Sequence, residues 1–311
     1  MHKFSRRHFL QMTALGVLGH VLPFPHNQNT SAADSDPLRQ SIADLIGDRQ
    51  IGLDLRRLNP DASEDFRIQI NADSLYPVAS CFKAFLVLYY LWYTPRDQWQ
   101  TGEDTPLHSV AVYSNNVQTG YVIDEVGRRL SYYGNTIQKF NDFLLYILNI
   151  QNGMYSWDWE NTPTAGYADE RFAPSSRRFI NHRGEAVQME NLFTARDFAD
   201  FYTRLIQPAP FPDYPFAQEA VQTTLDLLSI AAESYQSPIE RAFPQGYTGK
   251  DGVLPASDSA IGRVINDAGI LNVAGTNYVL AFFCAGEGEY LGINLLRQIA
   301  PLLEALENQR G

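Results

Sequence analysis

The sequence predicts an α+β fold, in which an antiparallel sheet is flanked by terminal helices and an all-helical subdomain is inserted into it. Apolar and polar residues alternate near both ends of the chain, as in half-buried strands. In the middle of the chain, apolar residues recur instead at helical spacing. We therefore expect an α/β subdomain from residues 34–87 and 242–311, and a helical subdomain from residues 88–241.

The N-terminal part of the predicted α/β subdomain reads as a helix, a hairpin and a second helix. Residues 37–48 carry an apolar stripe at helical spacing. Residues 51–56 and 66–70 alternate as strands, and Asn59-Pro60-Asp61 between them is typical of a turn. The apolar run that follows Pro77 and ends near residue 90 predicts a buried helix.

The rest of the chain divides into helical segments, one long loop and three strands. Helical spacing occurs in residues 121–129, 136–150, 194–206 and 215–232. Residues 151–191 have no sustained period, and a loop of that length is usually functional or a loose insertion. Strands are predicted at residues 246–252, 261–271 and 278–284, and a final helix at 291–306, where Pro301 should cause a kink.

The first 33 residues predict an export signal. Ser5-Arg6-Arg7-His8-Phe9-Leu10 resembles a twin-arginine motif, and a moderately apolar run follows it to residue 22. That run is too short to span a bilayer stably. Ser31-Ala32-Ala33 offers small residues for cleavage after Ala33. We expect the mature protein in the periplasm or outside the cell, without a membrane span; the alternative is a basic N-terminus of no function.

The composition limits the classes of partner. Removal of residues 1–33 leaves 21 basic against 35 acidic residues, a formal charge of −14, which disfavours nucleic acid and anionic membranes. Beyond residue 33 only His108 and His182 remain, too few for a His-rich metal site or a Ser-His-Asp triad. No haem, iron–sulfur or dinucleotide motif is present. We expect no metal or cofactor.

The two cysteines, Cys81 and Cys284, lack metal-ligand spacing and lie in strongly apolar runs. Such surroundings favour two buried thiols. A single disulfide is the alternative in an oxidising compartment.

The strongest chemical signal is Ser80 with Lys83 at the start of the apolar helix that ends near residue 90. Residues three apart lie on one helix face. A lysine there is costly unless it is paired or used, and loss of hydration favours its neutral form, which can accept a hydroxyl proton. The spacing alone occurs by chance in many chains.

Two further short patterns follow in a consistent order. Tyr113-Ser114-Asn115-Asn116 places a hydroxyl and an amide after a strand-like segment, residues 110–112, and before a helix. Lys250-Asp251-Gly252 places an ammonium and a flexible glycine on the first strand of the tail. Ser-x-x-Lys, Ser-x-Asn and Lys-x-Gly in this order are typical of penicillin-recognising serine acyltransferases.

On these residues the chain resembles a class A β-lactamase-type serine hydrolase, within the group of β-lactamases and D-alanyl-D-alanine peptidases. The resemblance covers most of residues 37–306 and is sharpest at 71–83 and 113–116. It implies that Ser80 is the acylated nucleophile and that Lys83 is its proton acceptor. It also implies that Ser114 relays a proton to the leaving nitrogen.

The same resemblance implies the substrate-binding groups. Asn116 would hold the amide side chain, and Lys250 would place positive potential beside the substrate carboxylate. The residue after Gly252 would complete an oxyanion hole, so that the backbone N–H groups of Ser80 and Val253 are its donors. Arg263 is an expected carboxylate anchor, with a structural salt bridge as the alternative.

Two positions depart from the family pattern. Glu160 is the best match to the family's water-activating glutamate, ahead of Glu170, Glu185 and Glu190, although the flanking Arg and Leu-Asn are missing; an ordinary surface glutamate is the alternative. Asp251 replaces the usual Thr or Ser, and it would repel a substrate carboxylate if it faced the site.

The expected activity is β-lactam hydrolysis through acyl-Ser80, which would fit antibiotic resistance or β-lactam catabolism. A D-alanyl-D-alanine peptidase, an esterase and a non-catalytic cell-wall-binding protein are the alternatives. The resemblance implies a small-molecule β-lactam or a peptidoglycan-like peptide as substrate, and a monomer.

Overall fold

The computed structural model describes residues 32–130, 135–157, 167–214, 216–235, 237–244, 246–255, 260–286 and 289–310. Residues 1–31, most of the predicted export signal, lie outside the described residues. Glu160 lies outside them as well.

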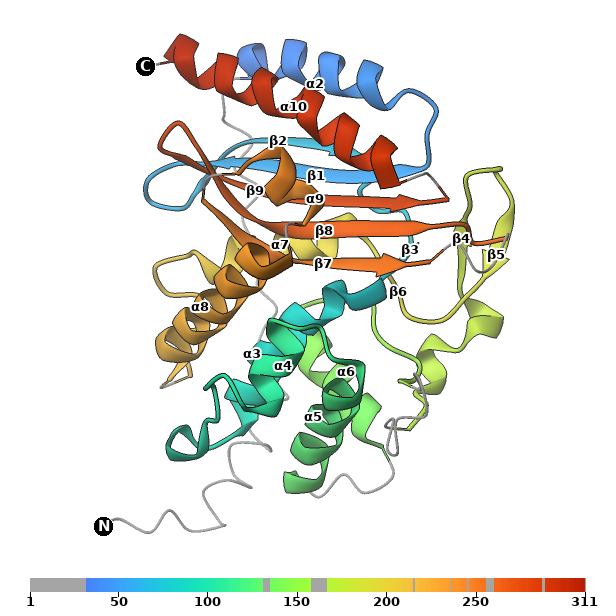
Figure 1. The fold of residues 1–311 in the computed structure, drawn as a ribbon, viewed down its shortest axis with the longest axis vertical. Coiled ribbons are helices and arrows are strands. Elements are labelled where there is room, and N and C mark those ends of the chain that lie inside the picture. The colour runs from blue at the N-terminus through green and yellow to red at the C-terminus, as the bar shows by residue number, and fades with distance from the viewer. Residues whose placement is uncertain are drawn as a thin grey trace. The chain divides into compact units, whose positions relative to one another are not determined.

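A five-stranded antiparallel sheet, in the order β2-β1-β9-β8-β7, joins the two ends of the chain (Figure 1). The strands are β1 Ile51–Leu58, β2 Glu64–Ile70, β7 Tyr247–Leu254, β8 Val264–Val273 and β9 Thr276–Ala285. Leu55 of β1 pairs with Ile68 of β2 and with Leu280 of β9, so the N-terminal hairpin adds directly to the C-terminal strands. The predicted α+β fold is confirmed.

Two terminal helices, α2 (Ala32–Ile46) and α10 (Glu289–Arg310), lie side by side over one face of this sheet (Figure 1). Period-two patterning explains the contact, because alternate residues of a strand share a face. Leu53 and Leu55 of β1 pack in one cluster with Ile42 of α2 and Leu296 of α10. The described helix α10 continues through Pro301, at the position where the sequence predicts a kink.

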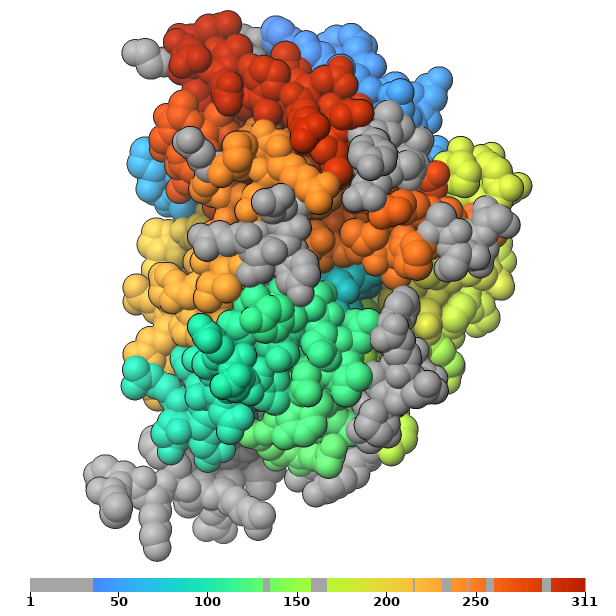
Figure 2. All heavy atoms as spheres, viewed as in Figure 1, coloured from blue at the N-terminus to red at the C-terminus, as the bar shows by residue number. Residues whose placement is uncertain are grey.

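The opposite face of the sheet contacts helices from the middle of the chain. These are α3 Lys83–Tyr93, α7 Ala195–Leu205 and α8 Ala217–Tyr235, and the helices α4 Pro106–Ala111, α5 Asn116–Arg129 and α6 Thr136–Tyr146 pack against α3. The short helix α9 Pro238–Ala242 lies instead against α10, β8 and β7, and its Ile239 belongs to the apolar cluster of α2 and α10. Helix α7 lies against β1, β8 and β9, and α8 lies against β7. In the space-filling view, α4 to α6 (green) form one part of the visible face and the C-terminal strands and α10 (orange to red) another (Figure 2).

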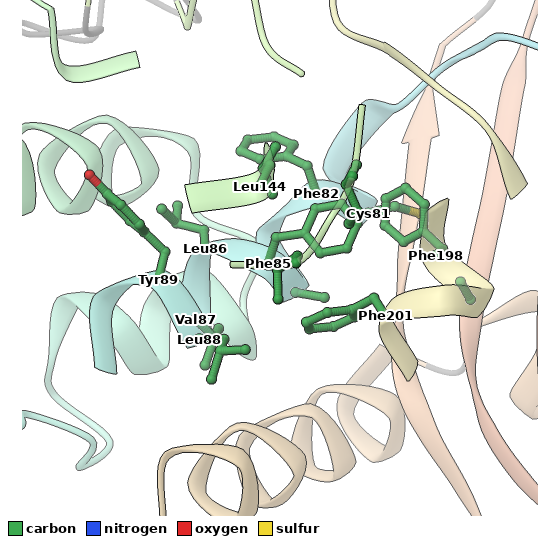
Figure 3. Packing of buried hydrophobic residues seen from close by; sticks show 14 of the residues in the cluster. Cys81, Phe82, Phe85, Leu86, Val87, Leu88, Tyr89, Leu144, Phe198 and Phe201 are labelled. Carbon is green, nitrogen blue, oxygen red and sulfur yellow. The ribbon is translucent and has the colours of Figure 1, made fainter. Parts of the chain in front are cut away.

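Helix α3 is the centre of the core on this side of the sheet. Its residues from Lys83 to Leu91 are all buried. The ring of Phe85 lies 4.4 Å from that of Phe198 and 4.8 Å from that of Phe201, both on α7, and these side chains pack together in Figure 3. Burial of an aromatic side chain contributes roughly 1.5–3 kcal/mol, so this cluster fixes α3 firmly against α7.

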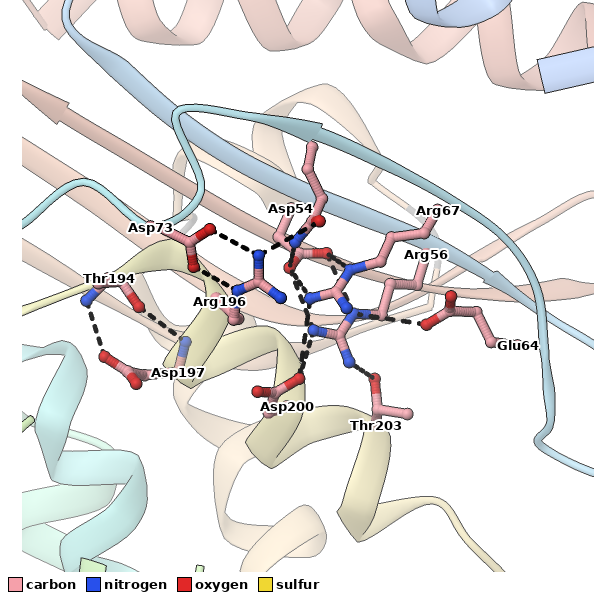
Figure 4. Close-up of polar contacts among 11 residues, drawn as sticks. Asp54, Arg56, Glu64, Arg67, Asp73, Thr194, Arg196, Asp197, Asp200 and Thr203 are labelled. Carbon is pink, nitrogen blue, oxygen red and sulfur yellow. Dashed lines mark hydrogen bonds and ion pairs between the residues drawn. The ribbon is translucent and has the colours of Figure 1, made fainter. Parts of the chain in front are cut away.

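Between β1 and α7 the contact is ionic instead of apolar (Figure 4). Asp54 is fully buried and accepts hydrogen bonds from Arg56 at 3.0 Å, Arg67 at 3.0 Å and Gln69 at 2.8 Å. Arg56 also donates to Asp200 of α7 at 2.5 Å. Burial alone would raise the pKa of Asp54, but the charges and hydrogen bonds of Arg56 and Arg67 outweigh it and lower the pKa. The alternation in β1 suggested a half-buried strand, whereas both of its faces are covered.

Some short elements differ from the sequence prediction. Residues 110–112, predicted as strand-like, belong to the end of helix α4 and its C-cap, because Pro106 and the Thr105 cap start a helix before them. Two-residue strands β3 (Tyr76–Pro77) and β6 (Leu192–Phe193) pair with each other. A small hairpin of β4 (Arg178–Ile180) and β5 (Ala186–Gln188) lies within the long loop. The boundaries of the two subdomains remain a prediction.

Among the described helices, none combines the length and the hydropathy that a membrane crossing requires.

The Asp54 network gives a test of stability. Asp54→Ala should lower the free energy of unfolding by about 3 kcal/mol, because it leaves Arg56 and Arg67 without a buried counter-charge. Asp73→Ala is the matched control: Asp73 also pairs with an arginine, Arg196, but is 71% exposed. Its loss should cost less than about 1 kcal/mol. Urea unfolding of the three proteins measures both values, and equal losses would show that the buried network does not stabilise the fold.

Candidate active site

Ser80 lies in a single 3₁₀ turn, Ala79–Phe82, that connects β3 to α3. Side chains three residues apart eclipse each other in a 3₁₀ turn, so Ser80 lies directly over Lys83, the first residue of α3. Ala79 has a left-handed φ of +51°, which is costly for a residue with a Cβ. Neighbouring segments hold this conformation: Asn266 donates to the carbonyl of Pro77 at 2.6 Å.

The amine of Lys83 is fully buried among four oxygen atoms. Its Nζ lies 3.0 Å from Ser80 Oγ and 3.1 Å from Ser114 Oγ. The Ser114 carbonyl oxygen at 2.6 Å and Asn116 Oδ1 at 2.7 Å are closer. The structure therefore brings the four residues of the predicted Ser-x-x-Lys and Ser-x-Asn patterns around one nitrogen atom.

Burial holds the pKa of Lys83 well below its usual value, and the positive charge of Lys250 lowers it further, against the opposing effect of Asp251. A neutral amine has two N–H donors and one lone pair. The carbonyl of Ser114 and Oδ1 of Asn116 are acceptors, and they can take the two N–H groups. The lone pair is then left for the hydroxyl groups, so Lys83 can accept the proton of Ser80.

Ser114 and Asn116 are positioned by the tight connection between α4 and α5. Ser114 has a left-handed φ of +52°, which turns its carbonyl oxygen toward Lys83. Asn115 is the N-cap of α5, and its side chain accepts the N–H of Gln118 at 3.0 Å. The middle residue of this motif thus supports the helix and leaves its two neighbours to face the site.

Strand β7, at the edge of the sheet, lies directly against the Ser80 turn. A Cβ on Gly252 would lie 2.6 Å from the backbone nitrogen of Ser80 and 2.7 Å from that of Cys81. Only glycine permits this approach. Val253 follows it and lines the same cavity as Ser80. Cys81 donates to the carbonyl of Lys250 at 3.3 Å, and neither Cys81 nor Cys284 forms a disulfide, which confirms two buried thiols.

Lys250 is buried in β7, and its ammonium is paired with its own neighbour. Its Nζ lies 2.9 Å from Asp251 Oδ1 and 3.0 Å from the carbonyl oxygen of Asp251. The positive potential expected at this end of the site is therefore largely compensated. Arg263 lies directly before β8, where its carbonyl oxygen accepts the N–H of Gly286 at 2.6 Å, and it is not among the residues that line the cavity.

A cavity of about 140 Å³ opens beside Ser80. It is lined by Pro77, Val78, Ala79, Ser80, Asn116, Met154, Ser156, Trp157, Met189, Glu190, Asn191, Val253 and Leu254. Both ends of the long loop reach it, because the side chain of Asn191 accepts the N–H of Tyr155 at 2.8 Å and donates to the carbonyl of Ser156 at 3.1 Å. The described parts of this loop therefore form a wall of the cavity.

Sequence reasoning missed or underrated two residues of this cavity. Trp157 donates its indole N–H to the carbonyl of Asn116 at 3.1 Å, and its ring lies 5.5 Å from Lys83 Nζ. Glu190, ranked below Glu160 from the sequence, accepts a hydrogen bond from the Ser156 hydroxyl at 2.8 Å. Leu192 pairs with Pro77, and this pairing brings the neighbouring Glu190 close to the Ser80 turn. Strands of two residues leave no periodic pattern in the sequence, so the pairing could not be predicted.

No family model and no curated protein matches the sequence. Solved structures match its fold. A class A β-lactamase from Bacteroides cellulosilyticus has a TM-score of 0.61 and 14% identity, covering 90% of this chain and 100% of that chain. A β-lactamase from Sphaerobacter thermophilus has a TM-score of 0.59 and 16% identity, covering 87% and 97%. One from Chitinophaga pinensis has a TM-score of 0.58 and 13% identity, covering 88% and 100%. At such identities the likeness establishes a β-lactamase-like fold and no more.

The approach of β7 to the Ser80 turn can be tested at Gly252. Gly252→Ala should lower the free energy of unfolding by about 1–3 kcal/mol, because the added methyl group meets backbone atoms that cannot rotate away. Gly102→Ala adds the same group where nothing lies within 4 Å, and it should change stability by less than about 0.5 kcal/mol. Chemical unfolding of both variants measures these free energies. If Gly252→Ala leaves the stability unchanged, β7 can move away from the Ser80 turn freely.

The protonation of Lys83 can be measured directly, because the chain contains only four lysines. In protein labelled with ¹³C at the lysine ε-carbon, one resonance should titrate far below the ordinary lysine pKa and disappear in Lys83→Met. Lys250→Met removes a nearby positive charge and leaves Asp251 unpaired, and both changes favour protonation. The pKa of Lys83 should therefore rise in that variant. An ordinary pKa in the unmodified protein would contradict the neutral amine.

Proposed function

We propose that this chain is an exported active-site-serine hydrolase of the class A β-lactamase type, which opens β-lactam amides through an acyl-Ser80 intermediate. The observation that carries the proposal is the buried amine of Lys83, 3.0 Å from Ser80 Oγ and 3.1 Å from Ser114 Oγ. The twin-arginine signal in residues 1–33 and the periplasmic or extracellular location belong to the same proposal.

Acylation would begin when Ser80 Oγ attacks the carbonyl carbon of the substrate and its proton passes to Lys83 Nζ. The C–N bond then breaks, and the leaving nitrogen takes a proton from the Ser114 hydroxyl, which Lys83 replaces. The amine ends this half-reaction neutral again. Lys83 and Ser114 can perform both transfers because each lies within hydrogen-bond reach of the next group.

The backbone would stabilise the oxyanion. We assign its two donors to the N–H groups of Ser80 and Val253, two residues that line the same cavity, and such a donor is commonly worth about 10²–10³ in rate. Asn116 would hold the amide side chain of the substrate. Lys250 and Arg263 are the proposed carboxylate anchors, with Lys250 already compensated by Asp251.

Deacylation needs a water molecule whose attack on the ester releases Ser80. A carboxylate that takes a proton from this water is the usual requirement, and Glu160 remains the proposed base. The pairing of Lys250 with Asp251 favours one second candidate function. An esterase of the same fold would need no cation, because its substrates need not carry a carboxylate. A D-alanyl-D-alanine peptidase would need such a cation as much as a β-lactamase does, so the pairing favours the esterase over the peptidase.

Covalent labelling tests the proposal. Incubation with a fluorescent penicillin should attach one label per chain, seen as a fluorescent band on a denaturing gel and as the matching increase in intact mass. Ser80→Ala should take up none, because it has no nucleophile. Release of the label with time, together with turnover of a chromogenic cephalosporin, would identify a β-lactamase.

Two controls keep this result interpretable. Ser109→Ala removes another partly buried hydroxyl near the site and should label like the unmodified chain. Circular dichroism must show that Ser80→Ala is folded. If the folded, unmodified protein takes up no label, the β-lactamase proposal is wrong, and p-nitrophenyl ester hydrolysis that depends on Ser80 would then support the esterase.

A further inference from the structure

Glu190 has no role in the chemistry proposed so far, although it faces the same cavity as Ser80. It is the only charged residue among the described residues that line this cavity. Its side chain is half-buried, and Oε2 accepts a hydrogen bond from the Ser156 hydroxyl at 2.8 Å. A carboxylate accepts through two oxygen atoms, so Oε1 remains available to a ligand.

The carboxylate of Glu190 has no cation as partner within the described part of the chain. Lys250 of β7 pairs with Asp251, and Arg177 of the same loop donates to Asn152 at 2.6 Å and to the carbonyl of Leu192 at 3.0 Å. A glutamate that is withdrawn from water normally has a counter-charge. One hydroxyl donor compensates this charge only in part, and a positively charged ligand group would complete it.

The position of the cavity indicates which part of a substrate meets Glu190. Lys83 and Ser114, the proposed proton relay to the leaving nitrogen, are not among the cavity-lining residues. The cavity extends from Ser80 toward Met154 and Met189 of the long loop. A substrate with its leaving group at Ser114 therefore places its acyl substituent in this cavity.

We propose that Glu190 is a specificity-determining residue that binds an ammonium group on the acyl side of the substrate. The inference rests on the proposed acyl-Ser80 chemistry. The preferred substrates are acyl compounds with a short, partly apolar acyl substituent that ends in or carries an amine. The two methionines and Trp157 contact the apolar part, and Glu190 forms a charge-assisted hydrogen bond with the amine. A substituent with a carboxylate is repelled.

Three penicillins with one nucleus test the proposal. Benzylpenicillin, ampicillin and carbenicillin differ at the α-carbon of the side chain, which bears hydrogen, an ammonium and a carboxylate, respectively. Their second-order acylation rates follow from competition with the fluorescent penicillin at mildly acidic pH. The unmodified protein should react about tenfold or more faster with ampicillin than with benzylpenicillin, and slowest with carbenicillin, as expected for one charge-assisted contact.

Glu190→Gln removes the charge but keeps an oxygen acceptor for Ser156, so the fold should tolerate it. The three rates should converge to within about twofold in this variant. Glu170→Gln is the matched control, because Glu170 is exposed and does not line the cavity. It should keep the full ranking of the unmodified protein.

The outcomes separate the two proposals. If none of the three penicillins acylates Ser80, the proposed function itself fails. If all three acylate it at similar rates, or if Glu190→Gln leaves the ranking unchanged, the proposed function stands and the ammonium site is wrong. A Glu190→Gln protein with an unchanged ranking and a stalled acyl-enzyme would show instead that Glu190 acts on the deacylating water.

Discussion

The burial of one amine without a carboxylate partner sets the arrangement of the whole site. Lys83 Nζ is enclosed by oxygen atoms from the 3₁₀ turn at Ser80, the α4–α5 connection at Ser114 and the first turn of α5 at Asn116. Each of these segments must therefore meet the start of α3. The aromatic cluster around Phe85 makes this possible, because it fixes α3 within the core and leaves the lysine no route to water. The lowered pKa of Lys83 is thus a consequence of how the core is packed.

The same requirement explains where the backbone is strained. Ala79 and Ser114 adopt left-handed conformations, at φ +51° and +52°; Ala79 directly precedes Ser80, and Ser114 itself contacts Lys83. Asn191, at φ +55°, closes the loop wall of the cavity. Conformations of this kind persist only where the surrounding structure determines them. Here the determinants are the contact of Gly252 with the Ser80 turn, the Asn266 hydrogen bond to Pro77, and the Asn115 cap.

The sequence predicted the parts of this structure that depend on local period and spacing. The patterns that predicted strands at β1, β8 and β9 and the Ser80–Lys83 spacing are local features, and the structure has strands and a close Ser80–Lys83 pair at these places. The failures involve partners that are distant in sequence or elements too short to have a period. Arg56 read as part of the polar side of a half-buried strand because its partner Asp200 is 144 residues further along the chain. Residues 110–112 gave a strand signal from three apolar positions, too few to reveal a helix that begins at a proline. The roles of the predicted site residues remain predictions.

The distribution of charge around Ser80 has a chemical consequence that its geometry alone does not show. A protonated Lys83 and an unpaired Lys250 would make the site cationic and suited to anions. Here burial lowers the pKa of Lys83 and Asp251 compensates Lys250, so among the described residues that line the cavity the remaining charge is that of Glu190. A neutral amine can accept the proton of a serine directly, whereas a protonated amine would first have to release its own proton from the buried site to solvent. In the proposed function, Asn116 and the backbone of β7 would orient the substrate, and Glu190 would move charge selection from the leaving-group end of the site to the acyl end.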